Sequence, residues 1–376
     1  MSAVALMASH FGPASAAALP STAVAQIGSA ANGLISEGHA PAVSVAVMQK
    51  GRVAFAEAYG LENLETRTAA STASVFRAGS ITKEFTAAAI MQLAQAGKLA
   101  IDDQVSKYVP ELAGAGPLTI RMLLNQTSGL HDYTNAAGFD VEELEQHTSK
   151  QLIDFIAAMK PVNDFKPGTQ WAYSNTNYFV LGVIVERASG ISVAGYLAKY
   201  VIAPAGLTAT GFDHVRDVVP GRASGYMSAK EKRGQYYNAP YIAMDNAGGA
   251  GQLRATALDL ALWQQALFAG RIVSEASVAA MTTPGRLSDG TVAVRQDAPI
   301  TPGQPNYGFG LELGKFDGVE AIGHGGAVPG FTAYLVTFPK RQLTVAIMTN
   351  GQVGPVEPFR EAFREIVRAA LHGLRP

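Results

Sequence analysis

Hydrophobic positions along the chain recur with two periods, and each period predicts a different kind of element. Apolar side chains three and four residues apart predict amphipathic helices near both ends of the chain, over 22–37 and 359–371, and another over 258–267. Alternating or unbroken short apolar runs predict strands, at 42–48, 53–59, 308–313, 333–338 and 343–348. The two ends of the chain therefore supply helices and antiparallel strands.

The middle of the chain has a mainly helical pattern instead. Short helices are predicted at 119–124, 140–160 and 177–188. Residues 205–250 are irregular and rich in glycine, tyrosine and proline, and long loops of this kind commonly wall a site. We expect an α+β fold in which N- and C-terminal helices flank an antiparallel sheet, with an inserted helical subdomain and a cleft where the two parts meet.

The N-terminal segment does not belong to the predicted fold. Residues 1–20 contain no Asp, Glu, Lys or Arg, are rich in alanine and end in Ala-Ala-Ala-Leu-Pro. This partly fits a secretory signal, although the basic n-region is missing, and a flexible extension is the alternative. We expect one domain over 21–376, with its sheet part from 21–79 and 305–376 and its helical part from 80–304. A periplasmic or secreted location is expected, with a cytoplasmic one as the alternative.

Composition and charge mainly exclude classes of function. With 48% hydrophobic residues and a formal net charge of -1, the chain lacks the electrostatic footprint of a protein that binds nucleic acid or an anionic membrane. No uncharged run is long and apolar enough for a transmembrane helix, so we expect no integral membrane association. The absence of cysteine removes disulfides, thiol nucleophiles and thiolate metal sites.

Neither a metal nor a cofactor is indicated. The seven histidines show no spacing typical of metal ligands. Glu142, Glu143 and Glu145 stand early in a predicted helix, where acidic side chains interact favourably with the helix dipole. No serine lies in the Gly-x-Ser-x-Gly elbow of an α/β-hydrolase. The oligomeric state stays open.

Ser80 and Lys83 are the first candidates for chemistry. They lie three residues apart at the start of a predicted helix, so both project from one face. A serine hydroxyl needs a base within hydrogen-bonding reach to act as a nucleophile, and a lysine one turn away can serve if burial lowers its pKa. By itself the pair is as typical of a solvated, capped helix end.

Two later stretches favour the chemical interpretation. Tyr173-x-Asn175 follows a turn at 166–169, and His324 opens a His-Gly-Gly run that can present backbone N–H groups to an oxyanion. Each has an ordinary structural alternative: a half-buried tyrosine, a helix cap at Asn175 and a polar group at a strand end. Together, in this order and spacing, the stretches supply a nucleophile, candidate bases, an amide and a glycine-rich strand.

The three stretches resemble the three motifs of the penicillin-recognising serine hydrolases. The resemblance is strongest to the branch of class C β-lactamases, D-alanyl-D-alanine carboxypeptidases, D-aminopeptidases and family VIII esterases. It extends around the motifs over 76–99, 123–133, 173–182 and 307–331, and covers about 22–372 in all. The resemblance implies the β-lactamase/transpeptidase-like fold and catalysis through an acyl-enzyme.

By this resemblance the catalytic residues are Ser80, Lys83, Tyr173, Asn175 and His324. Ser80 attacks a carbonyl carbon and becomes acylated. Lys83 and Tyr173 share the proton transfers, and Asn175 hydrogen-bonds Lys83 and the substrate. The backbone N–H groups of Ser80 and Ala327 form the oxyanion hole.

Departures from the family pattern bear on the substrate. His324 stands where β-lactamases of this branch carry a lysine, which argues against efficient β-lactam hydrolysis. Carboxypeptidases of this kind bind a terminal carboxylate through hydroxyls and an arginine, whereas the matching positions here are Gly325, Ala327 and Glu312. A carboxylate facing Glu312 would be repelled. The substrate-binding positions expected from the resemblance are Gly325, Gly326, Glu312 and Gln126.

We therefore predict a carboxylesterase-type hydrolase of small esters or of amides without a terminal carboxylate. One alternative is a D-aminopeptidase or D-amino-acid amidase, in which Glu312 binds the substrate ammonium, or a DD-peptidase. Another is a weak β-lactamase, or a penicillin-binding sensor that is acylated without turnover. The complete set of Ser80, Lys83, Tyr173 and Asn175 argues against the sensor.

Overall fold

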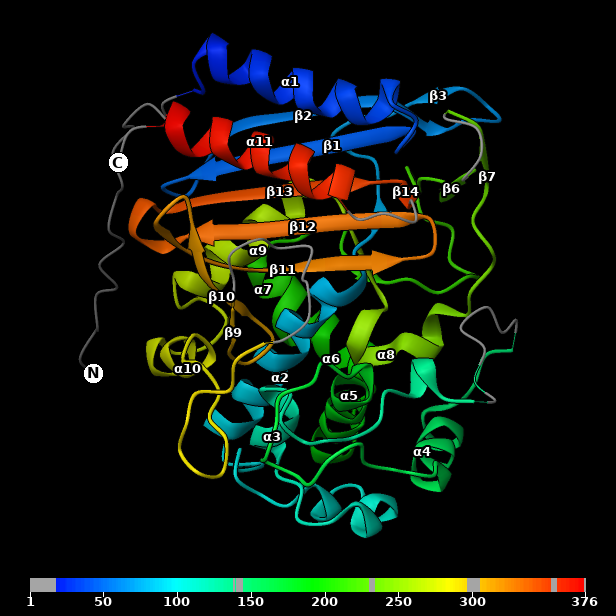
Figure 1. The fold of residues 1–376 in the computed structure, drawn as a ribbon, viewed down its shortest axis with the longest axis vertical. Helices are drawn as coiled ribbons and strands as arrows, with labels where there is room; N and C mark the ends of the chain where they lie inside the picture. The colour runs from blue at the N-terminus through cyan, green and yellow to red at the C-terminus, as the bar shows by residue number, and fades with distance from the viewer. Residues whose placement is uncertain are drawn as a thin grey trace, which may run out of the picture.

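An antiparallel sheet forms the centre of the protein. The computed structural model describes residues 18–137, 139, 145–229, 234–295, 305–352 and 357–374. Within them, eight strands pair in the order β3-β2-β1-β13-β12-β11-β10-β9 (Figure 1). These strands are β1 (Ala42–Gln49), β2 (Arg52–Asn63), β3 (Thr68–Ala69), β9 (Asn306–Tyr307), β10 (Glu312–Phe316), β11 (Val319–Val328), β12 (Phe331–Phe338) and β13 (Leu343–Thr349).

The two ends of the chain meet at the centre of this sheet. Strand β1 pairs with β13, and Val45 lies opposite Ile347. Their side chains face the terminal helices α1 (Ser21–Ser36) and α11 (Glu357–Gly373), which pack side by side over one face of the sheet (Figure 1). Successive side chains of a strand point to opposite faces, so Ala46 joins the core on the other side.

The opposite face of the sheet carries the helical part of the fold. Helices α2 (Thr82–Gln95) and α5 (Asn175–Ser189) are largely buried in this second core, and α9 (Ala257–Phe268) packs against β1 and β13. The remaining helices are α3 (Ile120–Leu124), α4 (Ser149–Ala158), α6 (Val193–Leu197), α7 (Ala203–Ala205), α8 (Gly248–Gly251) and α10 (Glu275–Met281). The loops carry two small sheets, made of β4 (Phe76–Arg77), β8 (Leu253–Ala255) and β5 (Gly211–Phe212), and of β14 (Gly351–Gln352), β6 (Tyr226–Ser228) and β7 (Tyr236–Asn238).

The α+β prediction is confirmed, but one predicted strand is wrong. The run 308–313 was expected to be continuous, whereas only its end belongs to β10. Gly308 N–H donates to the Leu311 carbonyl, and Gly310 has φ +70°, so the chain turns there. A side chain at Gly310 would lie 2.6 Å from the Lys83 carbonyl oxygen. The turn therefore lets this segment approach the first turn of α2.

Other boundaries differ from the sequence predictions by small amounts. The helix predicted within 140–160 is α4 at 149–158, and the expectation for Glu142 and Glu143 lies outside the described residues. Residues 1–17 also lie outside them, while Leu19 is buried in the core under α1 and α11. No single helix in the described ranges is long and apolar enough to cross a membrane. One bent helix pair, Asn175–Ser189 with Val193–Ala205, passes that test by length and composition.

Candidate active site

Ser80 lies in a tight 3-10 turn immediately before α2. The turn spans Gly79–Ile81, and the Thr82 hydroxyl fastens it by donating to the Gly79 carbonyl at 2.7 Å. The same hydroxyl accepts the Leu253 N–H at 3.0 Å, which ties the turn to β8. The nucleophile candidate therefore sits at the junction between α2 and the small sheet that contains β8.

Lys83 is fully buried one turn further along and contacts Ser80. Its Nζ lies 3.0 Å from Ser80 Oγ, 2.8 Å from Asn175 Oδ1 and 2.8 Å from the Ala250 carbonyl oxygen. Burial lowers the pKa of Lys83 from 10.5 to about 7, while the charges of Asp132 and Glu312 act in the opposite direction. Near neutral pH a substantial fraction of this lysine is therefore an uncharged amine.

Asp132 orients the amide of Asn175. Its Oδ2 accepts hydrogen bonds from both the Asn175 backbone N–H and Nδ2, each at 3.1 Å. The amide nitrogen of Asn175 therefore faces the carboxylate and its Oδ1 faces Lys83. The side chain of Asn175 does not cap α5, which corrects that part of the sequence interpretation.

Tyr173 approaches the same pair from the loop before α5. Lys83 Nζ lies 4.8 Å from the centroid of its ring. Burial raises the pKa of the Tyr173 phenol above its ordinary value, although a hydrogen bond with Ser80 opposes the shift. The hydroxyl is therefore protonated at neutral pH, and it can relay or donate a proton but is a poor phenolate base.

Gln126 holds this loop rather than facing a substrate. It is completely buried, and its Oε1 accepts hydrogen bonds from Ser174 N–H at 3.1 Å and Asn177 Nδ2 at 2.5 Å. Its backbone carbonyl accepts the Ala172 N–H. The expectation that Gln126 contacts the substrate is therefore corrected: it positions the residues on either side of Tyr173.

Strand β11 brings a second set of backbone N–H groups to Ser80. A side chain on Gly79 would lie 2.9 Å from Ala327 N, and one on Gly326 would lie 2.0 Å from the Ala78 carbonyl oxygen and 3.3 Å from Ser80 N. Only glycine at 326 permits this approach of strand and turn. The N–H groups of Ser80 and Ala327 thus lie on adjoining segments, as an oxyanion hole requires. Gly325 and Gly326 are buried strand positions and are absent from the cavity lining described below.

His324 is buried behind the site and is neutral. Its Nδ1 lies 2.5 Å from the Gly325 carbonyl oxygen, an atom that only accepts, so Nδ1 carries the proton. Nε2 then accepts from the Tyr307 hydroxyl at 3.0 Å. Burial and the nearby Lys83 hold the pKa of His324 well below its ordinary value. The centroid of the Tyr173 ring lies 6.2 Å from that of the imidazole, and His324 is not among the described residues that line the cavity in front of Ser80, so its catalytic role stays a prediction.

Glu312 does not face the substrate, which corrects the argument built on it. It is 3% exposed, and its Oε1 lies 2.7 Å from Arg295 Nη1. The Arg295 guanidinium lies over the rings of Trp171 and Tyr307 at 5.2 and 5.8 Å. A charge that is paired and buried neither repels a substrate carboxylate nor attracts a substrate ammonium. Glu312 therefore gives no argument against a carboxylate substrate and none for an ammonium substrate.

A cavity of about 250 Å³ opens in front of Ser80. Segment 205–250 contributes much of its wall, as the sequence predicts. No charged side chain is among its described lining residues, which are Ser80, Tyr133, Thr134, Asn135, Phe139, Asn175, Ile242, Ala243, Met244, Asn246, Ala247, Ala250, Gly251, Ala327, Val328 and Pro329. Over the part of the chain that the structure describes, no group of three or more metal-ligating side chains is gathered.

Four contributors to the site were missed in the sequence: Asp132, Arg295, Tyr307 and the Ala250 carbonyl. Asp132 follows the polar turn 125–130 and precedes a short 3-10 helix that its side chain caps, so a capping pattern was its only local signal. The other three act through contacts with residues far away in the chain, which no spacing indicates.

Comparisons with known proteins show which proteins this chain is similar to. Residues 21–370 match the Beta-lactamase family. The chain is 30% identical to penicillin-binding protein 4 of Amycolatopsis lactamdurans, over 91% of this chain and 88% of that protein. It is 27% identical to a D-aminopeptidase of Gluconobacter oxydans, over 88% of this chain but only 59% of that longer protein. The crystal structure of a D-amino acid amidase from Ochrobactrum anthropi superposes with a TM-score of 0.81 at 23% identity, over 94% of this chain and 99% of that one.

Proposed function

The chain belongs to the Beta-lactamase family and is a serine hydrolase, and we propose that it hydrolyses small uncharged esters or amides through an acyl-enzyme on Ser80. The family and the fold, which is β-lactamase/transpeptidase-like, set the reaction class. The roles of individual residues and the choice of substrate rest on the geometry of the site.

The environment of Lys83 Nζ carries the proposal. Two of its three neighbours, Asn175 Oδ1 and the Ala250 carbonyl oxygen, only accept hydrogen bonds. The neutral amine has two N–H donors, which these acceptors occupy. Its lone pair is then directed at the third neighbour, the Ser80 hydroxyl 3.0 Å away. Asp132 fixes the amide of Asn175 and so maintains this arrangement.

The reaction follows from that arrangement. Lys83 accepts the Ser80 proton as Oγ bonds to the carbonyl carbon, and the carbonyl oxygen becomes an oxyanion facing the N–H groups of Ser80 and Ala327. The proton passes from Lys83 through the Tyr173 hydroxyl to the leaving group as its bond to carbon breaks. A water molecule then attacks the acyl-enzyme, the same pair accepts its proton, and Ser80 is released with the proton restored.

The cavity supports an uncharged acyl group. Its described lining offers apolar side chains such as Phe139, Ile242, Met244 and Val328 and no charged group. A free carboxylate or ammonium would lose its hydration there without gaining a counter-charge. A neutral ester or amide avoids that cost.

A second candidate is the hydrolysis of D-amino-acid amides. It is supported by the similarity to a D-aminopeptidase across most of this chain. The lack of a charged group in the described lining argues against it, because a buried α-ammonium group requires a negatively charged partner such as a carboxylate.

The two candidates separate in one paired assay. Wild type and Ser80→Ala are given p-nitrophenyl butyrate, a D-alanine p-nitroanilide and nitrocefin, and intact mass is recorded after mixing. We expect Ser80-dependent turnover of the ester with little of the other two. Faster cleavage of the anilide moves the assignment to an amidase, and faster cleavage of nitrocefin moves it to a β-lactamase. A stable adduct on Ser80 without turnover would instead identify a sensor.

A further inference from the structure

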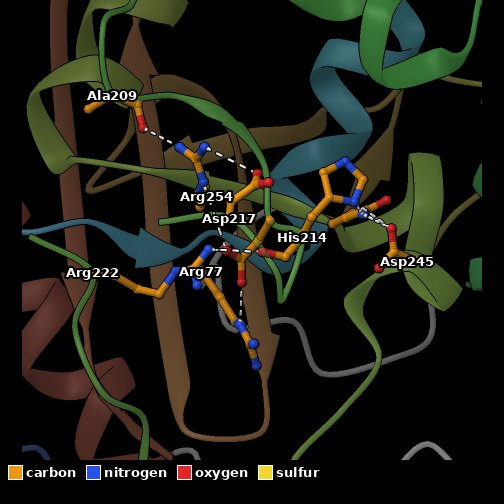
Figure 2. A network of polar contacts seen from close by, with 9 residues as sticks. Arg77, Ala209, His214, Asp217, Arg222, Asp245 and Arg254 are labelled. Carbon is orange, nitrogen blue, oxygen red and sulfur yellow. Dashed lines mark hydrogen bonds and ion pairs between the residues drawn. The ribbon is translucent and has the colours of Figure 1, made fainter. Parts of the chain in front are cut away.

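A second cavity of about 340 Å³ contains three arginines. Arg77, Arg222 and Arg254 all line it, and each lies within 4 Å of the Asp213 carboxylate. Figure 2 shows these three arginines close together, with Arg254 directed toward Asp217 and Ala209. Asp213 is 2% exposed. One buried carboxylate therefore lies among three guanidinium groups, none of which belongs to the active site described above.

Two of the arginines already satisfy the carboxylate. Arg77 Nε donates to Asp213 Oδ2 and Arg222 Nη2 to Oδ1, each at 2.8 Å. The Nε of Arg254 lies 3.8 Å from Oδ1, beyond hydrogen-bonding distance, and its Nη1 donates to the uncharged Ala209 carbonyl at 3.2 Å. Among the described residues, therefore, no acid accepts a hydrogen bond from Arg254.

A second acid, Asp217, is paired with Arg254 in the part of the chain that the structure describes, but it does not neutralise the excess positive charge. Asp217 Oδ2 lies 4.0 Å from Arg254 Nη2, and its side chain is 44% exposed. An exposed pair at that distance is weak and screened by salt. The cluster therefore retains an excess of positive charge.

The strand pairing makes the excess positive charge of the arginine cluster unfavourable unless an anion is present. Arg77 on β4 lies directly opposite Arg254 on β8. Like charges at directly paired strand positions are destabilising. In addition, the Nε atoms of Arg222 and Arg254 are buried without a hydrogen-bond partner among the described residues. Buried donors without an acceptor are uncommon in folded proteins and indicate a missing partner.

We propose that Arg77, Arg222 and Arg254 form a binding site for a carboxylate or phosphate group. Guanidinium groups present planar pairs of donors that match the oxygens of both anions. Asn238 and Tyr241 line the same cavity and add polar groups. Asp213 holds Arg77 and Arg222 in place, and Arg254 supplies the charge that the anion neutralises.

The anion site adjoins the active-site cavity. Tyr241 lines the anion site and the next residue, Ile242, lines the cavity in front of Ser80. Likewise, Pro329 lines the cavity in front of Ser80, and Phe331, two residues later, lines the anion site. The bound group is therefore either a free anion or the remote acidic end of a substrate, and the two sources can be separated by experiment.

Isothermal titration of the full chain with inorganic phosphate and with succinate, at fixed ionic strength, tests the site. The key variant is Arg254→Gln, which leaves both hydrogen bonds to Asp213 intact. Arg271→Gln removes the same charge from an exposed position and is the matched control. We expect saturable binding by wild type and by the control, and affinity weaker by about tenfold or more in Arg254→Gln, as for the loss of a charge-assisted pair. Absence of saturable binding by wild type, or equal affinity in Arg254→Gln, overturns the proposal.

Two further measurements complete the test. Turnover of the neutral ester p-nitrophenyl butyrate verifies that Arg254→Gln is folded. If that variant does not fold, Arg254→Lys replaces it: the charge remains but the planar fork is lost, and unchanged phosphate affinity then counts against the site. Mono-p-nitrophenyl glutarate distinguishes the two anion sources. A KM that rises in Arg254→Gln for this acidic ester alone, with competition by phosphate, assigns the site to a substrate group, and phosphate binding without that preference assigns it to a free anion.

Discussion

The pH dependence of acylation is the most direct test of the role of Lys83. If the neutral amine is the base, kcat/KM falls as pH drops through the pKa of this group in the free enzyme. Burial places that pKa at about 7. The sign follows from the charge: below about 7 Lys83 is an ammonium and cannot accept the Ser80 proton, whereas above it the amine predominates.

The magnitude follows from a single titration. With a pKa of about 7, only about one molecule in a hundred carries the neutral amine at pH 5, so kcat/KM should be about 100-fold below its plateau. A plot of log(kcat/KM) against pH should rise with a slope of one on the acid side of the pKa and should level off near pH 8. An ordinary lysine would place the same limb near pH 10.

Initial rates with p-nitrophenyl butyrate from pH 5 to 9, corrected for spontaneous hydrolysis, provide the profile. A second ester, p-nitrophenyl acetate, is the control, because a limb that belongs to the free enzyme must be the same for both substrates. Ser80→Ala gives the background at each pH. A flat profile between pH 5 and 7, or a limb centred near 10, would refute the assignment of Lys83 as the base.

Substitutions of Tyr173, Asp132 and Glu84 give three further predictions. Tyr173→Phe keeps the ring beside Lys83 but removes the proton relay, so kcat should fall by about 10²–10⁴-fold, and an unchanged kcat would exclude the relay. Asp132→Asn removes a charge that raises the pKa of Lys83, so the acid limb should move to lower pH while the plateau falls; a limb that stays in place contradicts this electrostatic coupling. Glu84 is buried with its pKa raised to about 8, so its ionisation destabilises the folded state progressively from about pH 4.5 to 8. Relative to wild type, Glu84→Gln should therefore gain about 3 kcal/mol of unfolding free energy between pH 6 and pH 9, measured by urea unfolding, and a pH-independent difference would contradict the shift.

Much of the fold was predictable because its signals are local. The period of apolar residues depends on nearest neighbours along the chain, and it located the strands and helices at both ends within a few residues. The placement of Ser80 beside Lys83 is local as well, since helical geometry alone puts residues three apart on one face. The strand expected at 308–313 failed because a turn at Gly310 serves a contact with α2, which lies far away in the chain.

Only the tertiary structure determined which charged groups lie close together and which of them are buried. The sequence predicts that Glu312 faces the substrate, and only the fold shows that it is buried against Arg295. Likewise, the chain pattern did not indicate that Asp132 orients Asn175 or that arginines from three separate segments surround Asp213. A residue's type and spacing determine which hydrogen bonds and charges it can offer. Desolvation and Coulomb interactions depend on what lies a few ångströms away in space, and for Lys83 that environment converts an ordinary ammonium into a base.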